Sequence, residues 1–302
     1  MEDMITGLCP QCGHTLHIPA ELASFSCMYC GARLTKEQLA AEPPAAQEAD
    51  EDRAAYYDRA VSRLGWCIKN FGGYQKKIMR DVFFEAFETY ETGCAPVIQE
   101  LARGVAPEQQ TQLLGRAAAA MLDELEAGWQ KKGDMEDEKI VLAIFFVPMV
   151  RKQQLPISEE FVTILQKQWV ERYPKSPFYL GDYESISGGF RKKFLGLCFI
   201  TTAVCQELGK PDDCEELTAF RAFRDGYLRS QPDGEALIRE YYNIAPGIVT
   251  CINTCSDRHA SYARIREEYL APCYQDLLAG RNESCKARYV RMVRDLEREY
   301  FS

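Results

Sequence analysis

The amino-acid sequence predicts a mainly α-helical protein in which a small N-terminal β zinc ribbon is tethered to a multi-helix body. Three observations lead to this fold class. Two Cys-x-x-Cys-Gly motifs lie within residues 9–31, an acidic segment without apolar periodicity follows, and apolar residues then recur at helical spacing along most of the remaining chain. The composition is that of a folded globular protein, because 46% of the 302 residues are hydrophobic and 27% are charged.

The first domain, residues 1–35, contains the most specific motif of the chain, CPQCG at 9–13 followed by CMYCG at 27–31. Each motif forms a tight turn that directs two thiolates at one centre, and its glycine permits the positive φ that turns backbone amides toward the sulfurs. We therefore predict one Zn²⁺ held by Cys9, Cys12, Cys27 and Cys30, with a rubredoxin-like iron site as the alternative. A closed shell of four thiolates leaves no position for water or substrate, so the predicted zinc is structural.

The residues between the two motifs complete the ribbon. The alternating segment TLHIP at 15–19 predicts a strand, and residues 24–26 are expected to return as its hairpin partner. His14 and His17 lie nearby, but the metal shell is complete without them, so we expect both at the surface or in support of the ligands.

An acidic linker over residues 36–52 follows the ribbon. The stretch EQLAAEPPAAQEADED at 37–52 has six acids, no base and two adjacent prolines, which is the composition of a flexible tether. The N-terminus is acidic where a signal peptide needs a basic and then an apolar run, so the thirteen cysteines indicate a reducing cytoplasm rather than a disulfide scaffold.

The net charge argues against nucleic acid as a partner. The chain has 36 Lys and Arg against 45 Asp and Glu, a net charge of -9, and residues 1–35 have three acids against one base. Phosphate backbones are bound by clustered bases, so we expect a protein partner instead. The one local exception is Arg191-Lys192-Lys193 beside Gly188-Gly189, which offers a grip for a single phosphate.

Residues 53–175 are predicted to form a helical bundle. The longest apolar run, residues 140–150, is too short to span a bilayer and contains Pro148, so we expect a buried helix and no membrane contact. Trp66, Trp129 and Trp169 are expected in the core. The sequence contains no phosphate-binding loop, dinucleotide fingerprint, nucleophile elbow or His-Glu-x-x-His motif, so no enzyme class is indicated.

Residues 176–302 are predicted to form a second helical domain. Helices are expected after Asp212, over 237–242 and over 248–259, with a break at Pro246. The final helix has a narrow apolar stripe that packs on the body or on a partner and is formed by Tyr289, Val293, Leu296 and Tyr300.

Three blocks of this domain resemble the CFI-box C-terminal domain of bacterial proteins: CFITTAVC at 198–205, RAFRDGYL at 221–228 and LIREYYNIAPGI at 237–248. The resemblance covers residues 194–253 and implies a small helical domain without a defined reaction. The whole plan, with its ribbon, helical middle and GGFRKKFLGLCFITTAVC segment, is also similar to cytoplasmic proteins of Gram-positive bacteria. The chain departs from the family pattern after CFI, where ATAAYG is common, and the departure adds Cys205.

Cys198 is the candidate residue for thiol chemistry. A cysteine nucleophile needs a base, and His259 is the one histidine outside the ribbon. Arg221, Arg224 and Asp225 follow in a helix that is otherwise apolar, where they indicate a buried charge network or the lining of a pocket. Free cysteine is among the most buried residue types, so core packing of Cys198 is the competing interpretation.

A second metal site would need residues from several elements. Cys251, Cys255 and His259 share a spacing of four and are expected along one helix face, where the first and last lie about 12 Å apart and cannot meet one zinc. An adjacent pair would have to be completed by other cysteines, namely Cys198, Cys205, Cys214, Cys273 or Cys285.

The sequence thus favours a non-enzymatic cytoplasmic adaptor or scaffold that contacts proteins through a zinc ribbon, and we assign no catalytic residue. The alternative is a thiol-dependent enzyme or redox sensor that uses Cys198, with His259 as its base.

Overall fold

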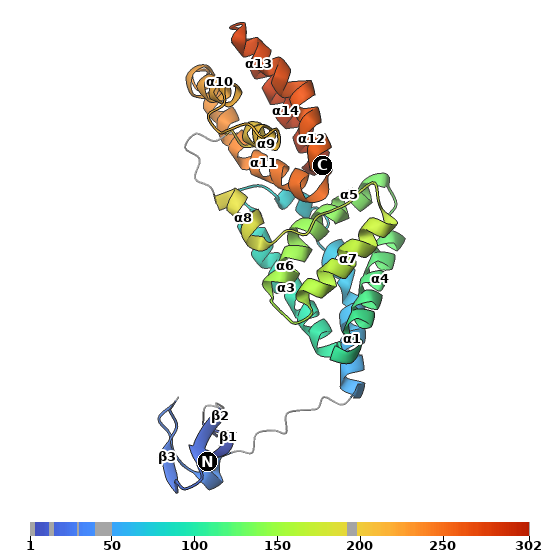
Figure 1. Cartoon of the computed structure of the whole chain (residues 1–302), viewed down its shortest axis with the longest axis vertical. Coiled ribbons are helices and arrows are strands. Elements are labelled where there is room, and N and C mark those ends of the chain that lie inside the picture. The colour runs from blue at the N-terminus through green and yellow to red at the C-terminus, as the bar shows by residue number, and fades with distance from the viewer. Residues whose placement is uncertain (1–3, 12–14, 29, 40–49, 192–197, 302) are drawn as a thin grey trace. The chain divides into compact units, whose positions relative to one another are not determined.

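The computed structural model describes residues 4–11, 15–28, 30–39, 50–191 and 198–301. The chain divides into two compact units, residues 1–54 and residues 55–302, which we name the N-terminal unit and the helical unit. Strands occur in the first and helices fill the second, which confirms the predicted mainly α class with a small N-terminal β region (Figure 1).

The N-terminal unit contains two antiparallel hairpins. Strand β1 (Met4–Leu8) pairs with β2 (Thr15–Pro19), and β3 (Ser24–Ser26) pairs with β4 (Arg33–Thr35), which leads into the short 3-10 helix η1 (Lys36–Gln38). The predicted hairpin between 15–19 and 24–26 is therefore wrong, although strands form at both places. The reason is local: each Cys-x-x-Cys segment lies between two strands and turns the chain back, so each hairpin forms across its own motif.

The first half of the helical unit has the following elements in chain order: α1 (Asp50–Leu64), α2 (Trp66–Lys69), η2 (Tyr74–Lys77), α3 (Phe83–Gly104), η3 (Pro107–Gln109), α4 (Gln110–Gly128), α5 (Lys132–Val141), η4 (Leu142–Phe146), α6 (Val147–Lys152) and α7 (Ser158–Arg172). The apolar run over 140–150 is buried throughout, as predicted. Its middle, η4, is a π turn just before Pro148, the residue that has no N–H for the helical ladder.

The second half continues with α8 (Tyr183–Arg191), α9 (Phe199–Glu207), α10 (Glu215–Phe223), η5 (Arg224–Leu228), α11 (Gly234–Cys255), α12 (Arg258–Ile265), η6 (Arg266–Leu270), α13 (Ala271–Leu278) and α14 (Asn282–Phe301). The predicted break at Pro246 does not occur, because α11 runs through it as one helix. Tertiary burial of the surrounding residues Ile244, Ala245 and Ile248 outweighs the one backbone hydrogen bond that proline removes.

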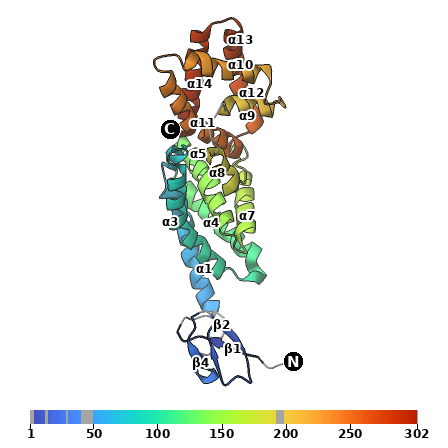
Figure 2. The same cartoon turned by 90° about the vertical axis from the view of Figure 1, so that its left-hand side faces the viewer.

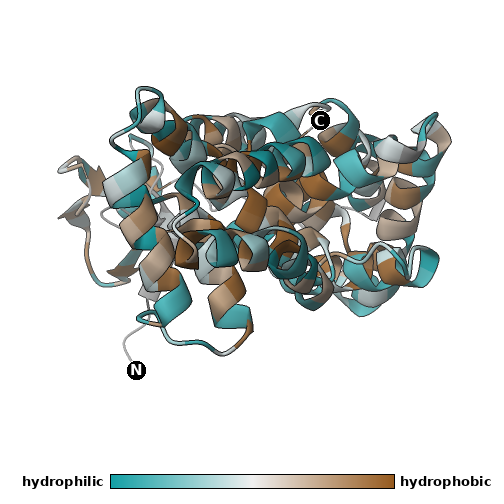
Figure 3. Cartoon of the chain, turned by 90° about the horizontal axis from the view of Figure 1, so that it is seen from above, coloured by the Kyte–Doolittle hydropathy of each residue, from teal (hydrophilic) through white to brown (hydrophobic). Residues whose placement is uncertain are grey.

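Helix α11 joins the two halves into one core. It packs against α5, η4 and α8 on one side and against α9, α12 and α14 on the other (Figures 1 and 2). One buried cluster extends from Tyr57 in α1 to Phe301 in α14, so the segments 53–175 and 176–302 share a single hydrophobic core. Figure 3 shows hydrophobic residues where these helices face each other and hydrophilic residues on their outer sides.

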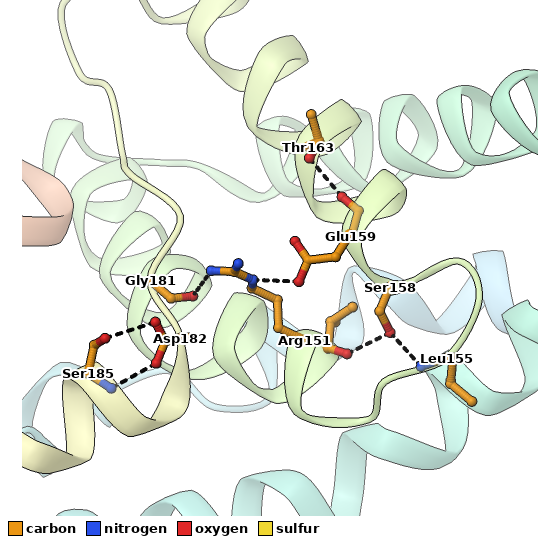
Figure 4. Close-up of polar contacts among 9 residues, drawn as sticks. Arg151, Leu155, Ser158, Glu159, Thr163, Gly181, Asp182 and Ser185 are labelled. Carbon is orange, nitrogen blue, oxygen red and sulfur yellow. Dashed lines mark hydrogen bonds and ion pairs between the residues drawn. The ribbon is translucent and has the colours of Figure 1, made fainter.

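The connection over residues 173–182 is fixed by polar contacts at the ends of α6 and α7. Arg151 donates through Nε to Glu159 Oε1 at 2.8 Å and through Nη1 to the Gly181 carbonyl at 3.0 Å (Figure 4). Asp182 then accepts from the backbone N–H and the hydroxyl of Ser185, both at 2.8 Å, and so begins α8. These contacts hold the second half against the first.

The three tryptophans differ in their burial. Trp169 is fully buried and donates through Nε1 to the Ser176 carbonyl at 2.7 Å, as expected for a core residue. Trp129 is partly buried and donates to Glu138 Oε2 at 2.7 Å. Trp66 is 38% exposed, so the prediction that it lies in the core is wrong.

Among the described residues, no helix is both long and apolar enough to cross a bilayer.

Candidate functional site

Three cysteines of the N-terminal unit converge on one point. The sulfur atoms of Cys9, Cys27 and Cys30 all lie within 4.8 Å of one another, and Cys9 Sγ is 3.7 Å from Cys30 Sγ. Thiolates around a tetrahedral zinc with Zn–S bonds near 2.3 Å are separated by about 3.8 Å, whereas disulfide-bonded sulfurs lie about 2.05 Å apart. The three sulfurs are therefore close enough to share one metal ion.

The second knuckle has the backbone that its sequence predicts. The Gly31 N–H donates to the Cys27 carbonyl at 2.8 Å, and the Cys27 N–H donates to the Ala32 carbonyl at 2.8 Å. Gly31 has φ +75°, a conformation that residues with a Cβ rarely adopt. This turn brings Cys27 and Cys30 to the same side of the β3–β4 hairpin end.

Three further residues were predicted at or near the metal site, namely Cys12, His14 and His17. Cys12, the fourth predicted ligand, lies outside the described residues, as does His14. His17 lies on β2 with an exposed side chain and is not part of the thiol group, as expected. Among the residues that the structure describes, no other set of three cysteine, histidine or carboxylate side chains lies close enough to share a metal ion.

Cys198 occupies the N-cap position of α9, and it is 4% exposed. Arg224 Nη1 donates to its sulfur at 3.5 Å. Burial raises the pKa of the Cys198 thiol, although the positive charges of Arg224 and Arg221 act in the opposite direction. The thiol is thus held as a neutral, buried group.

His259 is not brought to Cys198. The expectation that Cys251, Cys255 and His259 share one helix face is wrong. Helix α11 ends at Cys255, and His259 lies in the first turn of α12. Its side chain is 81% exposed, and Nδ1 lies 3.4 Å from Glu207 Oε1. Glu207 ends α9 and Cys198 precedes its start, so the two candidates lie at opposite ends of a helix about 13 Å long.

A small cavity of about 60 Å³ lies beside Cys198. Its lining is mainly apolar and includes Cys198, Phe220, Arg224, Tyr241, Tyr289 and Val293. The polar atoms around it already have partners, since the Ile200 N–H donates to the Tyr241 hydroxyl at 3.0 Å and the Thr201 and Tyr289 hydroxyls lie 3.1 Å apart. Arg221 points elsewhere and binds the backbone and carboxylate of Asp212, both at 2.8 Å. The surroundings of Cys198 are therefore those of a packed core.

Cysteines of the helical unit lie in pairs, which the sequence pattern does not predict. Cys94 Sγ lies 3.9 Å from the Cys67 carbonyl, and Cys273 Sγ lies 3.8 Å from the Cys285 carbonyl. A third pair joins the end of α9 to the start of α10, where Cys214 Sγ lies 3.9 Å from Cys205 Sγ. Only the short spacing of this third pair in the sequence could have indicated the contact.

Comparison of the chain with models of known protein families, with curated proteins and with solved structures finds no match. The features that bear on its function are therefore the thiol cluster of the N-terminal unit and the packing of the helical unit.

Proposed function

We propose that the chain is a non-enzymatic cytoplasmic adaptor whose N-terminal unit is a zinc ribbon that contacts another protein. The observation that carries the proposal is the convergence of three sulfur atoms within 4.8 Å. The buried apolar core of this unit is small and consists, among the described residues, of Cys9, Leu16, Ile18, Cys27 and Leu34. A core of this size supplies little folding free energy, which is the usual reason for a structural metal in a small domain.

Zinc is the metal that the donor set favours. Soft thiolate ligands in a tetrahedral arrangement select zinc or iron, and redox-inactive zinc is the usual choice in structural sites. Cys9, Cys27 and Cys30 would hold the ion, and Cys12 is the proposed fourth ligand. Such a closed shell contributes folding free energy and no reaction chemistry.

The proposed contact surface lies on the second knuckle. Met28 is 82% exposed, although it lies between the two ligands Cys27 and Cys30, and Leu22 in the preceding turn is 43% exposed. Methionine adapts its shape to a partner, and exposed apolar side chains on a small rigid unit are typical of protein contacts. The charge of residues 1–35 supports a protein partner over nucleic acid.

The alternative of an enzyme or sensor that uses Cys198 receives less support. A reactive thiol needs exposure and a nearby base or positive charge. Cys198 is buried, its neighbour Arg224 is already paired with Asp225, and His259 lies at the far end of α9. We propose that the segment resembling the CFI box acts as a packing element of the helical unit.

Site-specific photo-crosslinking tests the adaptor. A photoreactive side chain at position 28 should trap one discrete protein in cells, and the same group at position 37, where Glu37 in η1 is also exposed, serves as the matched control. The adduct should disappear when Cys9→Ser removes a metal ligand from the same chain. Adducts with nucleic acid, or adducts that are equal at positions 28 and 37, would contradict the proposal.

A further inference from the structure

Cys205 and Cys214 are already held in contact by the backbone between them. Cys205 lies in the last turn of α9, and Cys214 is the N-cap residue of α10. Their sulfur atoms are 3.9 Å apart. The connecting turn is fixed because the Lys210 N–H donates to the Cys205 carbonyl at 2.9 Å and the Cys214 N–H donates to the Pro211 carbonyl at 3.1 Å. To form a disulfide, the two sulfurs would have to approach from this contact to about 2.05 Å.

Access from solvent distinguishes this pair from the others. Among the described cysteines of the helical unit, Cys214 is the only one that is not buried. The pairs Cys67 with Cys94 and Cys273 with Cys285 are fully enclosed, so an oxidant cannot reach them without opening the fold.

Cys251 and Cys255 are excluded by helix geometry. They lie four residues apart on α11. Residues at this spacing have Cβ atoms about 5–6 Å apart, whereas a disulfide needs about 3.5–4.5 Å. Among the described cysteines of the helical unit, the pair Cys205 and Cys214 thus combines contact between the sulfurs with access from solvent.

We propose that Cys205 and Cys214 are a redox modification site, at which exchange with a low-molecular-weight disulfide forms a reversible bond between α9 and α10. This inference goes beyond the adaptor function and does not depend on it. Reversible bonds of this kind are the form in which disulfides occur in reducing compartments.

The reaction proceeds by two exchange steps. The accessible Cys214 thiolate attacks one sulfur of the small disulfide, which forms a mixed disulfide and releases one small thiolate. The Cys205 sulfur then attacks the Cys214 sulfur, loses its proton to solvent, and releases the second small thiolate. The two cysteines together lose two protons and two electrons, and the small disulfide is reduced to two thiols.

The environment of Cys205 explains this order. Burial is the largest cause that raises the pKa of the Cys205 thiol to about 12, followed by the charge of Cys214, the hydrogen bond with Cys214 and the charge of Glu216. Cys205 is therefore the poorer first nucleophile. Once Cys214 is in the mixed disulfide, it can no longer carry a thiolate charge, so the contribution of that charge to the raised pKa of Cys205 is removed before its own step.

The bond would connect two elements that surround Cys198. Cys198 is the N-cap residue of α9, and Arg224 directly follows α10, in which Arg221 also holds the turn through Asp212. A disulfide would close residues 205–214 into a covalent loop. The loop lowers the conformational entropy of the unfolded chain and hinders the opening of this turn. Oxidation is expected to raise the thermal midpoint of the helical unit and to slow amide exchange over 206–213.

Oxidised glutathione is the probe for the test, applied to the full, zinc-loaded chain under native conditions. Remaining thiols are blocked with N-ethylmaleimide, and the digest is analysed by mass spectrometry. The expected product is a disulfide-linked peptide that contains Cys205 and Cys214 and is reversed by dithiothreitol, while Cys273 and Cys285 of the same sample remain reduced. Metal release is followed in parallel with a chromogenic chelator, so that oxidation of the N-terminal cysteines is detected separately.

Two variants give distinct outcomes. Cys205→Ser should stop at a glutathione adduct on Cys214, and Cys214→Ser, which places a good N-cap residue at the same position, should leave Cys205 reduced. The proposal is wrong if both thiols of the native protein remain free while other cysteines react, or if the linked peptide forms only in urea.

Discussion

Arg224 donates through Nη1 to the sulfur of Cys198 at 3.5 Å and uses Nε and Nη2 to grip both carboxylate oxygens of Asp225 at 2.8 and 2.6 Å. The guanidinium is buried, and its charge is balanced by the adjacent carboxylate. The guanidinium therefore orients the Cys198 thiol, and its positive charge does not offset the effect of burial on the pKa of that thiol. Because burial also raises the pKa of Cys198, the contact places this cysteine in the core rather than in a reaction centre.

Cys198 is expected to resist alkylation in the native protein. With limiting iodoacetamide at pH 6 and pH 8, mass-resolved labelling should find Cys214 modified first among the cysteines of the helical unit and Cys198 protected at both values, because the two residues differ in exposure. Cys198→Ala should lower the free energy of unfolding by about 1 kcal/mol, as expected for loss of one buried methyl-sized group. Preferential labelling of Cys198 at pH 6 would instead support the thiol enzyme or sensor.

The purified chain is expected to bind one zinc ion. Cys9→Ser and Cys30→Ser should abolish binding because each removes a member of the thiol cluster. The thermal unfolding of the helical unit should be unchanged, because this unit has its own core. Elemental analysis and circular dichroism measure the two effects, and His17→Ala is the control that should retain the metal. No metal in the native chain, or two ions, would contradict the single site.

Gly247 marks a close approach of α11 to η2, and Gly247→Ala should destabilise the protein by about 3 kcal/mol or more. A Cβ atom at this position would lie 1.9 Å from the Ile78 carbonyl oxygen and 2.9 Å from Phe301 Cζ. Gly188→Ala on α8 is the matched control, because a Cβ there meets nothing within 4 Å and alanine favours the helix by about 1 kcal/mol. Chemical denaturation measures the free energy of unfolding of both variants. Equal values would contradict the close approach of α11 to Ile78 at Gly247.

Glu138 should make stability depend on pH. Burial raises the pKa of its carboxyl above the ordinary value of 4.5, and the hydrogen bond from Trp129 opposes the shift only in part. The folded state therefore holds the proton more tightly than the unfolded state, and this contribution to stability is lost as the pH rises through the folded pKa. Glu138→Gln keeps an acceptor for Trp129 and stays neutral, so its stability relative to the native chain should improve between about pH 4 and pH 7.

Urea unfolding at both pH values measures this difference. Glu88→Gln on α3 is the control, since Glu88 is exposed, and its effect should change less between the two conditions. If the difference in the free energy of unfolding between Glu138→Gln and the native chain is the same at both pH values, protonation of the Glu138 carboxyl is not coupled to folding.

The parts of the structure that depend on near neighbours in the chain could be predicted from the sequence. The mainly helical class, the buried helix over 140–150 and the tight turn from Cys27 to Gly31 are confirmed, because helical periodicity and knuckle geometry are set within a few residues. The predicted break at Pro246 was wrong because tertiary burial keeps α11 continuous. The predicted hairpin between 15–19 and 24–26 was wrong because each strand pairs across its own knuckle.

Contacts between distant residues were decided only by the tertiary structure. The sequence by itself identified Cys198, Arg224 and His259 as candidates, but the packing of α9 against α10 and α12 placed Arg224 against the thiol and His259 at the opposite end of the helix. The same packing buried Cys198 and left Cys214 accessible beside Cys205. The physical reason is that the sequence pattern defines which face of each helix is apolar, whereas the pairing of those faces depends on how all of them fill one core together.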